Sequence, residues 1–142
     1  MKLRAVLCPV LIATFCASLA FAQATYKPKF VGDPARSESE ARALGYMRVV
    51  LAAERTYHKR HGHYAHTLQD LVGQESFTKR MTNTTRDDYK VRFKGSNEAF
   101  SLWMDAMPQP GPTHRSFFAD EHGTIRGEED RNAGPDSPAV KH

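Results

Sequence analysis

Cysteine is almost absent from this chain of 142 residues, since only Cys8 and Cys16 occur and both lie in its first apolar segment. Once that segment is removed, no thiol remains for a disulfide framework, for redox chemistry or for a cysteine-bound zinc ion. The chain also has no glycine-rich loop of the kind that binds phosphate groups. These absences exclude a disulfide-stapled scaffold, a thiol enzyme and a phosphate-loop nucleotide enzyme.

A convincing catalytic set is also missing. A serine hydrolase needs a serine activated by a histidine that a carboxylate orients. Ser101 and Ser116 are the candidate nucleophiles, and neither lies on a strained turn. His114 is close to Ser116 in sequence, but residues two apart in a strand share a face by default, so this proximity does not indicate catalysis. We therefore predict that the protein is not an enzyme, and we expect no bound cofactor.

The excess of positive charge is small. The chain has 20 lysine and arginine residues against 16 aspartate and glutamate residues, and removing a signal that holds Lys2 and Arg4 leaves 18 against 16. The remaining charges are interspersed in sign, whereas nucleic-acid-binding proteins gather basic residues in one place. We therefore expect no nucleic-acid partner.

The first 24 residues have the three parts of an export signal. A positive start is followed by an apolar run over residues 5–22 and by a small-residue cleavage pattern that ends at Ala24. We predict a signal peptide over residues 1–24, with cleavage after Ala22 as the alternative, and a periplasmic or secreted protein. A retained membrane helix is the competing interpretation, but Pro9 interrupts the run. We expect no stable transmembrane anchor after cleavage.

The mature chain of about 118 residues is long enough for one domain with a modest core. We divide it into a flexible lead-in over residues 25–36, a folded domain over residues 37–126 and a tail over residues 127–142. The tail has almost nothing apolar to bury, so its composition predicts disorder.

The domain begins with a predicted long helix. Ser37 is expected to cap the amide of Glu40 while the Glu40 carboxylate reaches back, as in a capping box. Apolar residues then recur at helical spacing as far as about His61, and Gly62 is a natural stop. Because about 24 residues of helix extend about 36 Å, more than two short hairpins can cover, we expect the first turns to project.

Two polar or weakly apolar segments follow the helix. In the first, Thr67 can cap a short helix that buries Leu68, Leu71 and Val72. The second, residues 78–88, lacks any periodicity, and we expect a surface loop there.

The first of two predicted hairpins is placed by the alternation of faces along a strand. With residues 95–98 as the turn, one face of the hairpin is wholly apolar and the other carries charged residues and a tryptophan. The expected pairs are Tyr89 with Met104, Val91 with Leu102, and Phe93 with Phe100.

The second predicted hairpin turns at residues 120–123, with Gly123 at the position that needs a positive φ. This turn places Phe118 opposite Ile125. Between the hairpins, three prolines at every second position exclude an internal strand; they are Pro108, Pro110 and Pro112. The elements together predict an α+β fold in which one long N-terminal helix packs on a small antiparallel sheet of about four strands.

Two motifs resemble the headgroup of type IV pilins and type II secretion pseudopilins. The connector over residues 62–71 reads Gly-His-Tyr-Ala-His-Thr-Leu-Gln-Asp-Leu, and residues 115–126 read Arg-Ser-Phe-Phe-Ala-Asp-Glu-His-Gly-Thr-Ile-Arg. The resemblance covers roughly residues 40–138. It implies a pilin-like fold and a non-enzymatic subunit that contacts other envelope or pilin-like proteins. An ordinary export signal stands where pilins have their processing site and hydrophobic helix.

Two groups of residues are candidate metal ligands. The first consists of four histidines near the predicted end of the helix, which could offer nitrogens to Zn²⁺: His58, His61, His63 and His66. The second consists of Asp120 and Glu121 in the predicted turn, which could offer oxygens to Ca²⁺ together with the acidic residues 128–130. The alternative interpretation of both groups is a solvated helix end and a solvated turn.

One surface patch is a candidate for binding an anionic ligand. Lys90, Arg92 and Lys94 share the polar face of the first hairpin with Trp103, whose ring can stack on a ligand. The alternative interpretation is a strand kept soluble by cations whose stems cover the indole. The basic residues of the predicted long helix form a second patch, which we interpret as a solvated face relieved by Glu54; they are Arg42, Arg48, Arg55, Lys59 and Arg60.

The sequence thus favours an exported, non-enzymatic pilin-like protein that acts through protein contacts at the cell envelope. The alternative is a periplasmic ligand-binding or sensing module for an anionic or metal ligand.

Overall fold

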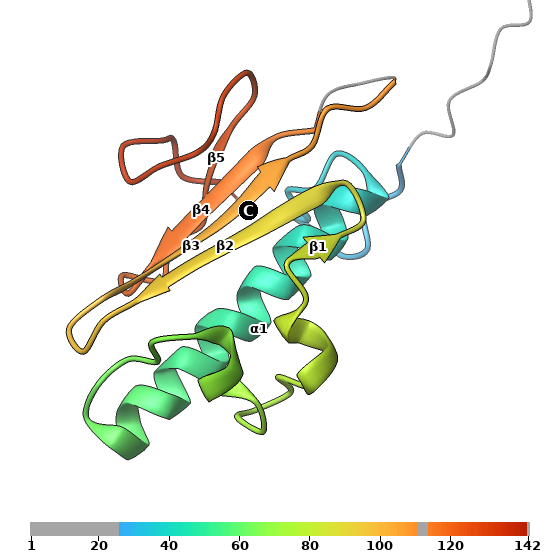
Figure 1. Cartoon of the computed structure of the whole chain (residues 1–142). Helices are drawn as coiled ribbons and strands as arrows, with labels where there is room; N and C mark the ends of the chain where they lie inside the picture. The colour runs from blue at the N-terminus through green and yellow to red at the C-terminus, as the bar shows by residue number, and fades with distance from the viewer. Residues whose placement is uncertain (1–25, 111–113, 142) are drawn as a thin grey trace, which may run out of the picture.

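The computed structural model describes residues 26–110 and 114–141. One long helix, α1 (Glu38–His61), lies along one face of a five-stranded antiparallel sheet of strand order β1-β2-β3-β4-β5 (Figure 1). The α+β fold is therefore confirmed. The predicted export signal and both possible cleavage points lie outside the described residues. Within these residues, none of the helices has the length and apolar character needed to cross a membrane.

The sheet is a simple meander, because neighbours in the sheet are also neighbours in the sequence. Its strands are β1 (Thr85–Arg86), β2 (Tyr89–Gly95), β3 (Phe100–Ala106), β4 (Ser116–Asp120) and β5 (Arg126–Glu128). The core fills the space between α1 and the inner face of β2, β3 and β4. Its fully buried side chains include Met47, Val50, Leu102, Met104 and Phe117.

Both ends of α1 lie where local signals place them. Ser37 has extended backbone and its side chain accepts a hydrogen bond from the Glu40 amide, and Gly62 ends the helix with a φ of 77°. The first turn does not project as expected, because Glu40 is only 2% exposed. Its carboxylate accepts from the amide of Arg36 at 2.9 Å instead of from that of Ser37, so only half of the capping box forms.

The two segments after α1 carry more regular structure than expected. Leu68 and Leu71 are buried in a short 3₁₀ helix, η1 (Leu68–Leu71), but Val72 is 41% exposed. The predicted surface loop contains a second 3₁₀ helix, η2 (Lys79–Thr82), and the short strand β1. Strand β1 is the fifth strand that the composition of this polar segment did not indicate.

The first hairpin has the predicted faces and a different register. Val91 pairs with Met104 and Phe93 with Leu102, so the pairing is shifted by two residues from the predicted one. The shift leaves every side chain on its predicted face, because faces repeat every two residues. The turn begins at Ser96, whose side chain accepts from the amide of Ala99 at 3.2 Å.

Gly95 explains why the turn starts one residue later than predicted. It remains in β2 and pairs with Phe100. A Cβ atom at this position would lie 1.7 Å from the carbonyl oxygen of Ala65, so only glycine allows the connector to pass this close to the strand.

The second hairpin is shifted by one residue from the predicted pairing. Gly123 has the expected positive φ of 77°. Phe118, however, pairs with Arg126 and not with Ile125. The shift places Ile125 against the core and Arg126 on the outer face of the sheet, beside Phe118.

The last residues of the chain, whose composition predicts disorder, lie against the edge of the sheet. The amide of Val140 donates to the carbonyl of Ile125 at 2.9 Å, and the amide of Gly127 donates to the carbonyl of Pro138 at 2.9 Å. Ala133 is buried. Backbone hydrogen bonds thus hold a segment that has few apolar side chains.

Candidate functional site

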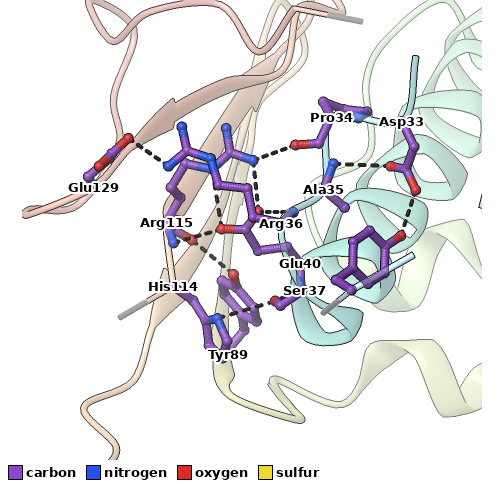
Figure 2. A network of polar contacts seen from close by, with 11 residues as sticks. Asp33, Pro34, Ala35, Arg36, Ser37, Glu40, Tyr89, His114, Arg115 and Glu129 are labelled. Atoms are coloured by element: carbon purple, nitrogen blue, oxygen red, sulfur yellow. Dashed lines mark hydrogen bonds and ion pairs between the residues drawn. The ribbon is translucent and has the colours of Figure 1, made fainter. Parts of the chain in front are cut away.

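The most connected polar site lies at the N-terminal end of α1, where Glu40 meets Arg115 of the segment that enters β4 (Figure 2). The two side chains make a bidentate pair, with Nη2 of Arg115 2.7 Å from Oε2 of Glu40 and Nε 3.2 Å from Oε1. Their side chains are only 12% and 2% exposed. A buried bidentate pair fixes both the separation and the orientation of the elements that it joins.

Further hydrogen bonds surround the Glu40 carboxylate. It also accepts from the backbone amides of Arg115 at 3.1 Å and Arg36 at 2.9 Å. Burial by itself would raise the pKa of Glu40, but the hydrogen bonds from Arg115 and Arg36 lower it below its ordinary value. Arg115 also donates to the carbonyl of Pro34 at 2.7 Å, so one guanidinium joins the lead-in, α1 and β4.

A second chain of contacts runs beside this pair. Nδ1 of His114 lies 3.3 Å from the hydroxyl of Ser37, and Nε2 lies 3.1 Å from a carboxylate oxygen of Asp88. The hydroxyl of Ser39 donates to the same oxygen of Asp88. Tyr89 stacks on His114 and donates its hydroxyl hydrogen to the carbonyl of Arg115 at 2.9 Å.

Ser37, His114 and Asp88 are the residue types of a hydrolase triad, but their geometry gives Ser37 another task. Its hydroxyl oxygen accepts from the Glu40 amide at 3.1 Å and thereby caps α1. The serine considered from the sequence, Ser116, has its hydroxyl 3.0 Å from the amide of Ala106, from which it accepts. The network ties the start of α1 to β4 and to the β1–β2 turn.

The four candidate histidines lie around the C-terminal end of α1, and each ring has a partner of its own. His58 stacks on Tyr64 at 4.3 Å, and His61 lies against Tyr57 at 4.3 Å. His63 hydrogen-bonds the carbonyl of Tyr64 at 2.9 Å, and His66 hydrogen-bonds the side chain of Asn97 at 2.8 Å. In residues 26–110 and 114–141, no three of these rings bring their nitrogens within 4.8 Å of one another.

Asp120 and Glu121 are brought together with His122, which the sequence analysis did not include. One donor atom of each lies within 4.8 Å of the others. The arrangement follows from the turn, in which Asp120 accepts from the amide of His122 at 3.0 Å. Ca²⁺ needs six to eight oxygen ligands, and two carboxylates and an imidazole supply fewer.

Two of the acidic residues 128–130, considered as further ligands, are engaged elsewhere. Glu128 pairs with Arg131 at 2.9 Å and Glu129 pairs with Arg36 at 2.7 Å. Both contacts draw the carboxylates away from a shared site with Asp120.

The candidate anion-binding patch lies on the outer face of β2 and β3, as the alternation predicts. Within it, the guanidinium of Arg92 lies 4.6 Å above the ring of Trp103 and forms a bidentate pair with Asp105. Arg92 therefore covers one face of the indole, while Lys90 and Lys94 make no ion pair in the part of the chain that the structure describes. A row of paired residues crosses the sheet here, with two aromatic residues between two arginines: Arg92, Trp103, Phe118 and Arg126.

Glu54 is a buried acid whose position was misjudged from the sequence. It was expected on the solvated face of the helix, but its side chain is fully buried beneath the connector. One carboxylate oxygen accepts from the amide of Ala65 at 3.2 Å, and the other has no partner within the described residues. Burial raises the pKa of Glu54 to about 7.

The polar contacts at the N-terminal end of α1 were missed by sequence reasoning because their partners are distant in the chain. Glu40 and Arg115 are separated by 75 positions, and Ser37 and His114 by 77. The Ser-x-x-Glu motif marked Glu40 as a local cap and gave no sign of Arg115. Comparison with protein-family models, with curated proteins and with solved structures finds no match to this chain.

Proposed function

We propose that the protein is an exported, non-enzymatic pilin-like headgroup that acts through protein contacts at the cell envelope. The observation that carries this proposal is the closed N-terminal end of α1. The helix starts at a capped Ser37, and the preceding residues Pro34 and Arg36 turn back onto Arg115 and Glu40. This closed end supports a headgroup that does not use the hydrophobic helix through which pilins enter filaments.

The two motifs behind the resemblance each form a defined piece of structure, which supports the proposal. The connector, residues 62–71, ends in η1, and its Asp70 accepts from the amide of Thr67 at 2.9 Å. Residues 115–126 form β4, the tight turn and the start of β5. The order of helix, connector and antiparallel sheet is the order that the resemblance implies.

The internal use of the polar residues supports a role in contacts over a role in catalysis. Ser37, His114 and Asp88 bond to one another, and Glu40 bonds to Arg115. These contacts hold the domain together, which favours a function carried out by exposed residues that bind a partner.

Capture of partners tests the proposal. The full chain, with a photoreactive amino acid at exposed positions, is expressed in a bacterial host with its own signal, and intact mass identifies the exported form. We expect a chain shortened by the signal and a stable crosslink to an envelope protein. A retained signal, or the absence of any crosslink together with a melting-temperature shift by a small anion or a metal ion, contradicts the proposal in favour of the ligand-binding alternative.

A further inference from the structure

A groove runs between α1 and the segment that follows the β4 turn. Its volume is about 380 Å³. Four of its lining residues are apolar and come from three separate segments: Leu44, Leu51, Ile125 and Val140. Pro34, Gly123 and Thr124 complete the wall, and two arginines of α1 stand beside it.

The two arginines, Arg48 and Arg55, belong to the same stripe of the helix as Leu44 and Leu51. They are seven residues apart, which is two helical turns and a rise of about 10.5 Å. The groove is therefore lined by two arginines whose backbone positions lie about 10.5 Å apart along the helix axis.

The structure separates these arginines from two other arginines of the same helix, and Lys59, which also makes no ion pair among the described residues, does not line the groove. Arg42 pairs with Asp87 at 3.2 Å, and Arg60 donates to the side chain of Gln74 at 3.0 Å. Arg48 and Arg55, by contrast, make no hydrogen bond or ion pair within residues 26–110 and 114–141. The basic face predicted as solvated thus contains two arginines that line a groove and that make no ion pair among the described residues.

The surroundings of Arg48 leave its charge available. Its guanidinium lies 5.6 Å from the ring of Phe30, which is 50% exposed. Asp33 makes no ion pair with Arg48, although the charge of Arg48 helps to lower the pKa of Asp33; the Asp33 oxygens accept from the hydroxyl of Tyr26 at 2.6 Å and from the amide of Ala35 at 3.1 Å.

We propose that this groove binds an acidic segment of a partner protein, with two carboxylates that pair with Arg48 and Arg55 and apolar side chains that lie between them on Leu51 and Ile125. An acidic helix with carboxylates seven residues apart matches this spacing. The proposal rests on the proposed contact function and names the chemistry of the partner.

Charge complementarity favours a partner over the chain's own N-terminal residues. Residues 1–25 contain two basic residues and no acid, so they cannot supply the carboxylates. A small inorganic anion would pair with the arginines but would leave the apolar lining residues uncovered. An acidic and apolar peptide satisfies both parts of the groove.

A titration followed by amide resonances of the exported protein tests the proposal. The probe is a synthetic helical peptide with two glutamates seven residues apart and leucines between them on the same face. The matched peptides replace both glutamates by glutamine or by lysine. We expect the glutamate peptide alone to shift the resonances of Arg48, Arg55 and Ile125.

Paired variants localise the binding. Arg48→Gln with Arg55→Gln should weaken binding of the glutamate peptide by about tenfold, as expected for two solvent-accessible ion pairs. Arg42→Gln with Arg60→Gln removes the same charge from the same helix outside the groove, and should change the affinity by less than about twofold. Equal losses in the two variants, or equal binding of the glutamate and glutamine peptides, would overturn the proposal.

Two further results separate this proposal from its alternatives. Binding to vesicles of phosphatidylglycerol without binding of the glutamate peptide would assign the groove to a lipid headgroup and overturn the proposal of an acidic protein segment. A crosslinked envelope partner retained equally by the wild type and by the Arg48→Gln, Arg55→Gln variant would overturn the groove as the contact site while leaving the contact function in place. No crosslink in the wild type contradicts the contact function, and the peptide titration then still decides the groove.

Discussion

Two buried glutamates on α1 experience opposite environments. Glu40, in the first turn, is 2% exposed and meets Arg115, whereas Glu54, four turns further on, is fully buried with one oxygen unpaired. Burial raises the pKa of Glu54 to about 7, while the hydrogen bonds from Arg115 overcome burial and lower that of Glu40. The partner, and not the depth, decides whether a buried acid keeps its charge.

The largest expected effect comes from breaking the pair at Glu40. Arg115→Met leaves a buried carboxylate without its cation, and we expect a loss of about 3–5 kcal/mol in the free energy of unfolding, measured with urea. The double variant Glu40→Leu, Arg115→Met removes both charges and should regain most of that loss. A loss below about 1 kcal/mol in the single variant would show that the pair does not anchor α1.

The next effect concerns Glu54 and its pH dependence. Because its folded pKa of about 7 exceeds the unfolded value of 4.5, the folded state holds the proton more tightly. Its contribution to stability is therefore complete below pH 4.5 and is lost as the pH rises to about 7, by about 3 kcal/mol. Glu54→Gln should remove this loss, so the variant should gain stability over the wild type at pH 8.

Urea unfolding at pH 5 and pH 8 measures the Glu54 effect, and Glu38→Gln is the matched control. Glu38 lies on the same helix with its side chain 58% exposed. Parallel pH profiles for the wild type and Glu54→Gln would show that Glu54 is charged in the folded protein.

A smaller effect is expected at the cap that lies beside Glu40. Ser37→Ala removes the acceptor of the Glu40 amide and the contact to His114, and should cost about 1 kcal/mol. Ser37→Asp keeps a capping oxygen and should restore the stability of α1. If the alanine variant unfolds at the same urea concentration as the wild type, the cap contributes nothing beside the Glu40–Arg115 pair.

The smallest effect is expected for an exposed pair on the same helix. Arg42 and Asp87 lie 3.2 Å apart with side chains 57% and 41% exposed. Arg42→Gln should change the free energy of unfolding by no more than about 0.5 kcal/mol, because water screens exposed charges. A loss as large as that of Arg115→Met would remove the distinction between buried and exposed pairs.

Predictions from the sequence were correct where the interactions join residues that are close together in the chain. Ser37 and Gly62 were identified correctly because caps act within a few residues of the chain. The faces of the first hairpin were correct because alternation is a local property of a strand. The register was shifted by two residues, since alternation alone cannot distinguish pairings that differ by an even number.

Errors arose where a distant segment intervened. Gly95 stays in β2 because Ala65 passes over it, and Phe118 faces Arg126 because Ile125 turns towards the core. The strand β1 is the exception, because β2 follows it after a short turn and offers its polar residues a partner. For Gly95 the deciding contact joins residues whose proximity no local pattern encodes.

The sequence by itself determined the extent of α1, the apolar face of the sheet and the end of β3 before Pro108 and Pro110, because caps, periodicity and proline geometry act through neighbouring residues; Pro112 lies outside the described residues. Only the tertiary structure decided that Glu40 is paired, that Glu54 is not, and that Arg48 and Arg55 open onto a groove. The physical reason is that the pKa and the pairing of a side chain depend on the solvent and charges that packing brings to it, and packing joins segments far apart in the chain.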